Sequence, residues 1–122
     1  MKDNPIILHI DLGNQSVHGW LKENQYTIFS ELIRYSKKLL EEKLDMIQAI
    51  MVSNLHDNIV FILKKENVKL TLDKAMDFFM EIEEYEKCAE IRNLNILIQN
   101  LENEATNTKV SKPNQRKSKI NR

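Results

Sequence analysis

The sequence predicts a mostly α-helical fold: a small domain of three to four helices that ends in an antiparallel helical hairpin, after a short extended N-terminal segment. The chain has 122 residues, a length that fits one domain. Its only glycines and prolines are Gly13, Gly19, Pro5 and Pro113, all outside residues 20–112. Tight turns between strands favour glycine, so a glycine-free stretch this long indicates helices. Hydrophobic residues also recur there at spacings of three and four, which is typical of amphipathic helices.

Residues 1–25 are expected to be extended or irregular. Hydrophobic side chains alternate from Ile6 to Leu12, which predicts a short strand or a docking arm that needs a pairing partner. A turn is expected at residues 13–16. Trp20 either anchors this segment on the helices or marks a surface for a partner.

A helical domain is expected over residues 26–106. Its first helix covers residues 26–44, where apolar side chains form one stripe: Phe29, Leu32, Ile33, Leu39, Leu40 and Leu44. A second helix is expected over residues 46–66, with Asp45 as its N-cap. The run 59–63 fits a buried strand as well as a helix. We prefer the helix because the flanking residues keep the helical period.

The clearest feature of the chain is the stretch from Thr71 to Glu104. Thr71 is expected to cap a helix that ends near Ile82, and the acidic residues 81–84 are expected to reverse the chain. The last helix then covers residues 84–104. Its apolar stripe is Tyr85, Cys88, Ile91, Leu94, Ile98, Leu101 and Ala105.

Residues 72–93 resemble the UVR motif, a short helical hairpin of bacterial excision-repair subunits and of some Clp-type ATPases and their partners. The family pattern places Tyr/Phe-Glu-x-Ala-Ala-x-Leu-Arg-Asp after an acidic turn, and residues 85–93 read YEKCAEIRN. Cys88 stands where the first Ala is usual, and Asn93 where Asp is usual. The resemblance implies a docking hairpin for another protein, often a like hairpin, and it implies no enzymatic activity.

Four residues of this hairpin are candidates for binding a protein: Phe78, Tyr85, Glu86 and Arg92. Aromatic residues and arginine dominate the energetics of protein interfaces. Arg92 is expected to pair with Glu86 or Glu90 or with an acidic partner. In the alternative interpretation, Phe78 and Tyr85 belong to the intramolecular core and Arg92 is a solvated charge.

Nothing in the sequence predicts an enzyme, a metal site or a cofactor. His9, His18, His56 and Cys88 have no spacing that would give two metal ligands on one helical turn. Cys88 lies in an apolar stripe, which favours a small buried hydrophobic side chain over a nucleophile. A single cysteine forms no intramolecular disulfide, which suits the cytoplasm. No signal peptide and no apolar run of about 20 residues is present, so no membrane association is expected.

Residues 107–122 are expected to form a disordered tail. They hold six of the 18 basic residues and none of the 18 acidic ones: Lys109, Lys112, Arg116, Lys117, Lys119 and Arg122. Such a tail can contact nucleic-acid phosphates, or it can simply keep the chain soluble. It holds no aromatic residue for stacking on bases, so we expect any such binding to be weak and salt-sensitive.

The expected function is therefore non-catalytic protein binding, as an adaptor, a regulator or an assembly component acting through the helical hairpin. The partner is an unidentified protein or a second copy of the chain. Two alternatives stay open: a nucleic-acid-associated accessory protein that uses the tail, and a structural component of a phage particle or bacterial complex. The high content of Lys, Asn and Ile is compatible with an AT-rich genome, such as that of a low-GC bacterium or its phage.

Overall fold

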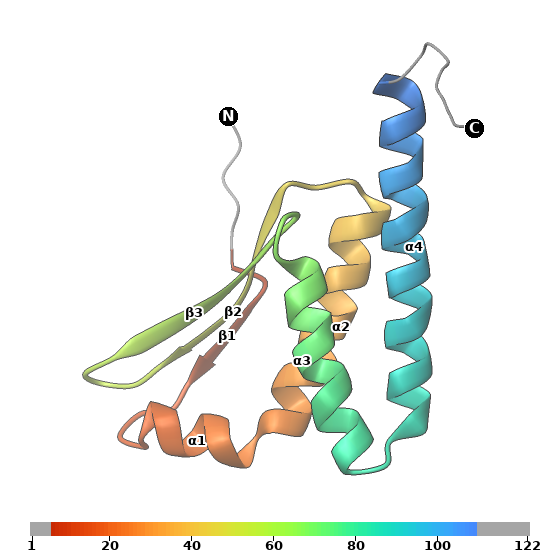
Figure 1. The fold of residues 1–122 in the computed structure, drawn as a ribbon. Helices are drawn as coiled ribbons and strands as arrows, with labels where there is room; N and C mark the ends of the chain where they lie inside the picture. The colour runs from red at the N-terminus through yellow and green to blue at the C-terminus, as the bar shows by residue number, and fades with distance from the viewer. Residues whose placement is uncertain (1–5, 110–122) are drawn as a thin grey trace.

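A computed structural model describes residues 6–109 of the chain, with side chains described as far as residue 105. Strands and helices are combined in an α/β arrangement (Figure 1). The elements are β1 (Leu8–Asp11), α1 (Val17–Glu23), α2 (Gln25–Glu41), β2 (Met46–Ser53), β3 (Asn58–Lys64), α3 (Val68–Glu81) and α4 (Tyr85–Lys109). Among residues 6–109, no helix is both long and apolar enough to cross a lipid bilayer.

The sheet has the strand order β1-β2-β3, with β1 parallel and β3 antiparallel to β2. Ile50 at the centre of β2 lies opposite Leu8 on one side and Phe61 on the other. The pairing with β3 shifts register between Gln48 and Ile50, so Ala49 is the extra residue of a β-bulge. Helices α1 and α2 supply the long connection that a parallel pair of strands requires.

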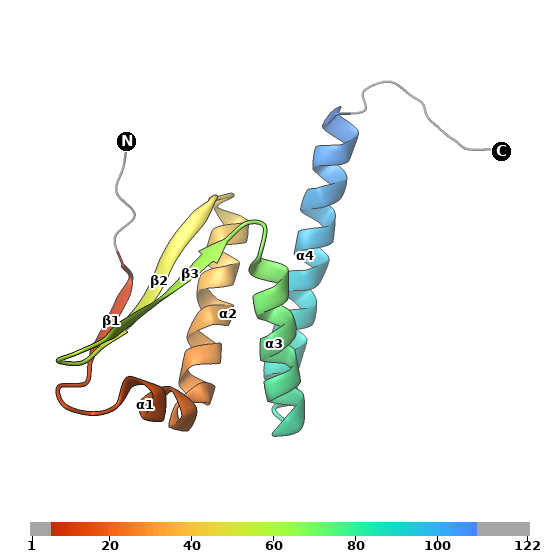
Figure 2. The ribbon, with the colours of Figure 1, turned by 60° about the vertical axis from the view of Figure 1, so that its left-hand side comes forward.

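The hydrophobic core lies between one face of the sheet and the helices. Figure 2 shows α2 directly beside the sheet, with α3 and α4 farther out. Residues from every layer are buried to 1% exposure or less, among them Ile50, Leu39, Leu72, Phe79 and Ile91. The opposite face of the sheet is covered by no helix of the described chain (Figure 2).

The prediction of a mostly helical fold is wrong, because residues 46–66 form the β2–β3 hairpin instead of a second helix. The alternative of a strand at 59–63, which we did not prefer, is the correct one. Asp45 consequently precedes a strand and caps no helix. The turn forms without glycine because the Asn54 side chain accepts hydrogen bonds from the backbone N–H groups of His56 (2.8 Å) and Asp57 (2.7 Å).

The N-terminal segment is also more regular than expected. The alternating residues form β1, and residues 17–23, expected to be irregular, form α1, whose N-cap Ser16 accepts a hydrogen bond from Gly19 N–H at 3.1 Å. The predicted helical domain, residues 26–106, therefore contains two of the three strands. At its other end, α4 continues to Lys109, and the rest of the predicted tail lies outside the described residues.

Candidate protein-interaction surface

The chain reverses direction between α3 and α4, at the acidic segment that predicted a hairpin. Glu83 adopts a left-handed backbone conformation with φ 62°. Its N–H donates to the carbonyl of Met80 at 3.1 Å, and Glu84 N–H donates to the carbonyl of Phe79 at 2.8 Å. These two bonds make a Schellman motif, which satisfies the last carbonyls of α3 and turns the chain back. The hairpin is therefore closed by backbone hydrogen bonds, without the glycine that usually marks such a turn.

The two helices of the hairpin pack closely along their inner faces. Cys88 and Ile91 of α4 are 1% and 0% exposed, and Leu72 and Phe79 of α3 are both 0% exposed. The small side chain of Cys88 permits close approach of the helices. With these inner residues buried, the outer faces of the two helices are the surface that the hairpin offers to a partner.

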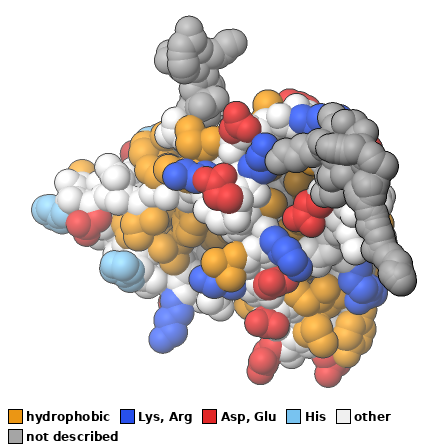
Figure 3. All heavy atoms as spheres, turned by 45° about the horizontal axis from the view of Figure 1, so that its top comes forward, with side chains coloured by type: hydrophobic (Ala, Val, Ile, Leu, Met, Phe, Trp, Pro, Cys, Tyr) orange, Lys and Arg blue, Asp and Glu red, His pale blue; other side chains and the backbone are white. Residues whose placement is uncertain are grey.

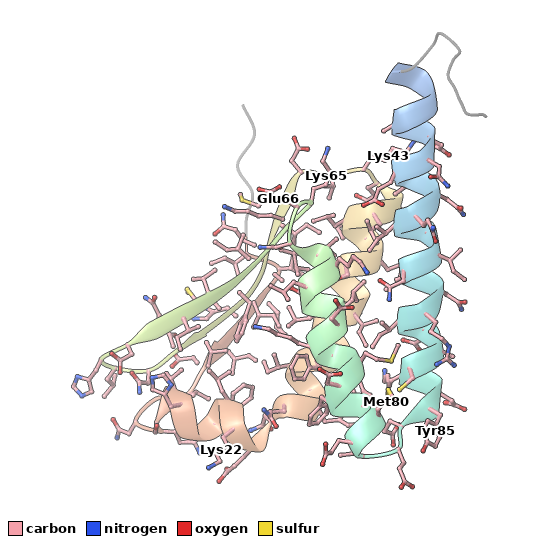
Figure 4. The ribbon with its side chains drawn as sticks, in the orientation of Figure 1. Lys22, Lys43, Lys65, Glu66, Met80 and Tyr85 are labelled. Atoms are coloured by element: carbon pink, nitrogen blue, oxygen red, sulfur yellow. The ribbon has the colours of Figure 1, made fainter. Side chains whose placement is uncertain are left out.

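Large hydrophobic side chains gather at the closed end of the hairpin. Met80, Ile82 and Tyr85 are 55%, 43% and 62% exposed, and we call them the hairpin-tip cluster. Figure 4 shows Met80 and Tyr85 at this end, on either side of the turn. Four exposed or half-exposed carboxylates surround the cluster: Glu81, Glu83, Glu84 and Glu86. Figure 3 shows hydrophobic and acidic side chains side by side over the lower part of the hairpin.

Tyr26, at the start of α2, holds the hairpin in place. Its hydroxyl donates a hydrogen bond to Glu84 Oε1 at 3.2 Å, and its ring meets the ring of Phe79 edge-on at 5.4 Å. Desolvation, followed by the negative charge of Glu84, raises the pKa of Tyr26 above its ordinary value. The neutral phenol is thus the form that the hairpin stabilises.

The structure separates the four predicted binding residues. Tyr85, Glu86 and Arg92 are exposed on α4, and the spacing of seven residues places Tyr85 and Arg92 on one outer stripe. Phe78 is partly buried instead, with its ring 5.3 Å from Phe29 and 5.1 Å from Phe79. Phe78 therefore contributes to an intramolecular aromatic cluster, as the alternative interpretation proposed.

Arg92 has a free guanidinium in the described part of the chain. The ion pairs among the described residues use Arg34, Lys38 and Lys65 as the bases, so the expected pairs of Arg92 with Glu86 or Glu90 are not formed. An unpaired arginine beside exposed aromatic surface is available to a partner.

Three exposed hydrophobic residues of this surface were not predicted: Met80, Ile82 and Ile96. Ile96 is 56% exposed and follows Arg92 by four residues, which puts it on the same stripe as Tyr85. That spacing was the signal in the sequence. It was overlooked because Ile96 falls outside the apolar stripe predicted for the last helix.

The predicted tail site cannot be placed on this surface. Lys109 is the last residue of α4, at the end opposite the hairpin tip (Figure 1). The other five basic residues lie outside the described part of the chain: Lys112, Arg116, Lys117, Lys119 and Arg122.

The described residues hold little that resembles a reaction centre. Within residues 6–109, no group of three His, Cys, Asp or Glu side chains is placed to bind a metal ion. Cys88 is buried as a free thiol. His9 Nε2 lies 3.0 Å from Ser53 Oγ, a contact between neighbouring strands on the exposed sheet face. A serine nucleophile also needs a carboxylate that orients its histidine and donors that stabilise an oxyanion. The nearby carboxylate of Asp11 accepts a hydrogen bond from Gly13 N–H instead of orienting His9. The absence of catalysis remains a prediction.

Two grooves run along α4. The groove between α2 and α4 encloses about 460 Å³ and is lined by polar and charged side chains such as Ser30, Glu31 and Lys87. The second encloses about 670 Å³ near the C-terminal ends of α2 and α4, with Leu40 and Leu101 in its apolar lining. Figure 4 shows Lys43 and Lys65 at this second end, far from the hairpin tip.

Comparison with known proteins finds no match to this chain among protein-family models, curated proteins or solved structures. The resemblance of residues 72–93 to the UVR motif therefore remains a prediction that rests on those residues alone.

Proposed function

We propose that this protein is a non-catalytic protein-binding module, acting as an adaptor, regulator or assembly component through the closed end and outer stripe of the α3–α4 hairpin. The observation that supports this most is the hairpin-tip cluster. Three large hydrophobic side chains are exposed at one end of a hairpin whose inner residues, among them Leu72, Phe79 and Ile91, are buried. Exposed apolar groups gathered within a polar rim are typical of protein-interaction sites.

The chemistry of this surface indicates the kind of partner. Tyr85 offers a large, rigid, amphipathic ring, and the free Arg92 lies two turns away on the same helix. Both residue types are enriched among interface hot spots. The surrounding carboxylates favour a partner whose contact surface has an apolar depression with Lys or Arg residues around it.

The hairpin is also preorganised for binding. The Schellman turn at Glu83 fixes the angle between the helices, and the hydrogen bond from Tyr26 to Glu84 ties the turn to α2. A surface that is rigid before binding loses less conformational entropy when the partner arrives.

The test is affinity capture from the native source, followed by calorimetry with the purified partner. We expect Tyr85→Ala and Arg92→Ala each to weaken binding by about tenfold or more, which corresponds to roughly 1.4 kcal/mol or more. The matched control is Leu55→Ala, because Leu55 is 70% exposed but lies between β2 and β3. Unchanged affinity of both hairpin variants, with an intact fold, would contradict the proposal.

We also place this activity in the cytoplasm, because the one cysteine is a buried free thiol rather than part of a disulfide. The two alternative functions depend on the tail or on composition. No described residue favours either of them, so they remain predictions.

A further inference from the structure

The strand β3 is an unprotected edge of the sheet. It lies at one end of the strand order, and its sequence N-I-V-F-I-L-K has five hydrophobic residues in succession. Proteins usually protect such an edge with proline, a bulge in the strand or a charge near its middle. β3 has none of these, since the bulge lies on β2 and its only charged residue, Lys64, is at the end.

The sheet face next to this edge also carries exposed hydrophobic side chains, among polar ones such as His9 and Ser53. Ile62 of β3 and Ile7 beside β1 are 42% and 43% exposed on the face opposite the helices. Val60 and Met51 are half-buried on the same face, directly opposite each other. Helices α2 and α3 lie on the other side of the sheet (Figure 2). Both the backbone edge and the adjoining side chains are therefore open to another strand.

The sequence around β3 is complementary to itself when two copies run antiparallel. If Phe61 lies on the two-fold axis, Val60 of each copy lies opposite Ile62 of the other. The same register places Asp57 opposite Lys65 of the other copy. Both charged residues are exposed, and an interface between identical subunits requires this kind of self-complementary pattern.

Lys65 lies one residue beyond the end of β3, within the turn that leads to α3. Figure 4 shows Lys65 and Glu66 at the turn where β3 ends, away from the hairpin tip. Among the residues that the structure describes, Lys65 pairs with Asp45 alone, at 3.8 Å and in the open, where such a pair contributes little. Lys65 is therefore available to the second copy.

We propose that β3 is a self-association edge, at which a second copy of this chain adds its own β3 in antiparallel register about Phe61 to form one six-stranded sheet. The occupant is a second copy rather than a foreign peptide because opposite charges meet at both ends of the paired strands. Such a dimer keeps both α3–α4 hairpins free, so it would present two copies of the proposed binding surface.

The test uses charge reversal and mixing, followed by analytical ultracentrifugation. In a dimer of the Asp57→Lys variant, the introduced lysine meets Lys65 at both ends; in a dimer of Lys65→Asp, two aspartates meet at both ends. We expect each variant to raise the dimer dissociation constant by about tenfold, because two cross-strand pairs become repulsive. An equimolar mixture of the two variants restores opposite charges in both pairs, and the mixed dimer should form with nearly wild-type affinity.

A second set of variants separates this interface from the hairpin. Val60→Lys combined with Ile62→Lys places like charges opposite each other at the centre, and we expect it to abolish the dimer with the fold intact. Ile96→Lys, on the outer stripe of α4, is expected to leave the dimer unchanged. A wild-type chain that remains monomeric at about 0.5 mM, or a mixture of charge variants that associates no better than each alone, would overturn the proposal. A dimer lost only in Ile96→Lys would assign self-association to the hairpin instead.

Discussion

The helical hairpin of α3 and α4 and the β-hairpin of β2 and β3 are both rich in hydrophobic residues, but they differ in how their buried positions are spaced. In α3 the fully buried residues Leu72, Ala75 and Phe79 follow one another at intervals of three and four. In β2 the bulge at Ala49 sets the buried residues Ile47 and Ile50 three apart. A β-bulge thus gave a strand the spacing of a helix, and spacing alone could not distinguish the two hairpins.

The largest effect is expected from a pair of substitutions in β2. A helix over 46–66 would bury Met51, whereas the strand buries Val52 (0% exposed) and directs Met51 to the open face. Val52→Asp is therefore expected to cost about 4 kcal/mol or more in unfolding free energy, because it buries an unpaired charge. Met51→Asp is expected to cost about 1 kcal/mol or less. Urea denaturation of both variants measures these losses. A larger loss for Met51→Asp than for Val52→Asp would favour a helix over residues 46–66.

The corresponding pair in the helical hairpin is Ile91 and Ile96. Ile91 is 0% and Ile96 56% exposed, although both are isoleucines of one helix. We expect Ile91→Ala to destabilise the fold by about 3 kcal/mol, and Ile96→Ala by about 0.5 kcal/mol or less. Equal losses in thermal and urea denaturation would mean that the outer stripe of α4 is buried.

The turns that close the two hairpins are expected to show a smaller contrast in unfolding free energy. Asn54→Ala removes the acceptor of two backbone N–H groups in the β-hairpin, so we expect a loss of about 1–2 kcal/mol. Glu83→Gly relieves a left-handed backbone, for which we expect a gain of about 0.5–1 kcal/mol in the unfolding free energy. A loss of stability in Glu83→Gly would show that the Glu83 side chain, rather than the backbone, holds the turn.

The smallest effect is a dependence on alkaline pH that arises in part where Tyr26 of α2 meets the helical hairpin. The pKa of Tyr26 is raised in the folded state by desolvation and by Glu84, while the unfolded value stays near 10. The folded state therefore holds this proton more tightly, and stability should fall as the pH rises above about 10. Urea denaturation at pH 9 and pH 11 should show a smaller fall for Tyr26→Phe than for the wild type. An identical fall would contradict a role of this phenol.

How much of the fold could be predicted differs between the hairpins for physical reasons. The helical hairpin keeps an uninterrupted helical period and marks its turn with acidic residues, so its position near residue 83 could be predicted. The β-hairpin is turned by the side chain of Asn54, and its bulge conceals the strand period. Helix α2 ends at Glu41, earlier than expected, because Lys43 adopts a left-handed conformation (φ 55°) without glycine. Such turns leave no strong signal in a sequence.

The candidate site was predictable only in part. Tyr85 was predicted as a binding residue but also as part of the apolar stripe of the last helix, and that second prediction is wrong because Tyr85 is 62% exposed. Its spacing of seven residues from Arg92 puts both on the outer face of α4. Met80, Ile82 and Phe78 are all hydrophobic residues near the same turn, and the sequence holds nothing that ranks their exposure. Only the packing of Phe78 against Phe29, and the lack of such packing around Met80, separates core from surface.

The most direct test of the central claim is an NMR titration of the isotope-labelled chain with its purified partner, in which both hairpins are observed at once. We predict that chemical-shift changes concentrate on Met80, Ile82, Tyr85, Arg92 and Ile96, and that the signals of β2 and β3 stay nearly unchanged. Changes confined to the open face of the sheet, around Met51 and Ile62, with an unperturbed helical hairpin, would contradict the claim that the hairpin binds the partner.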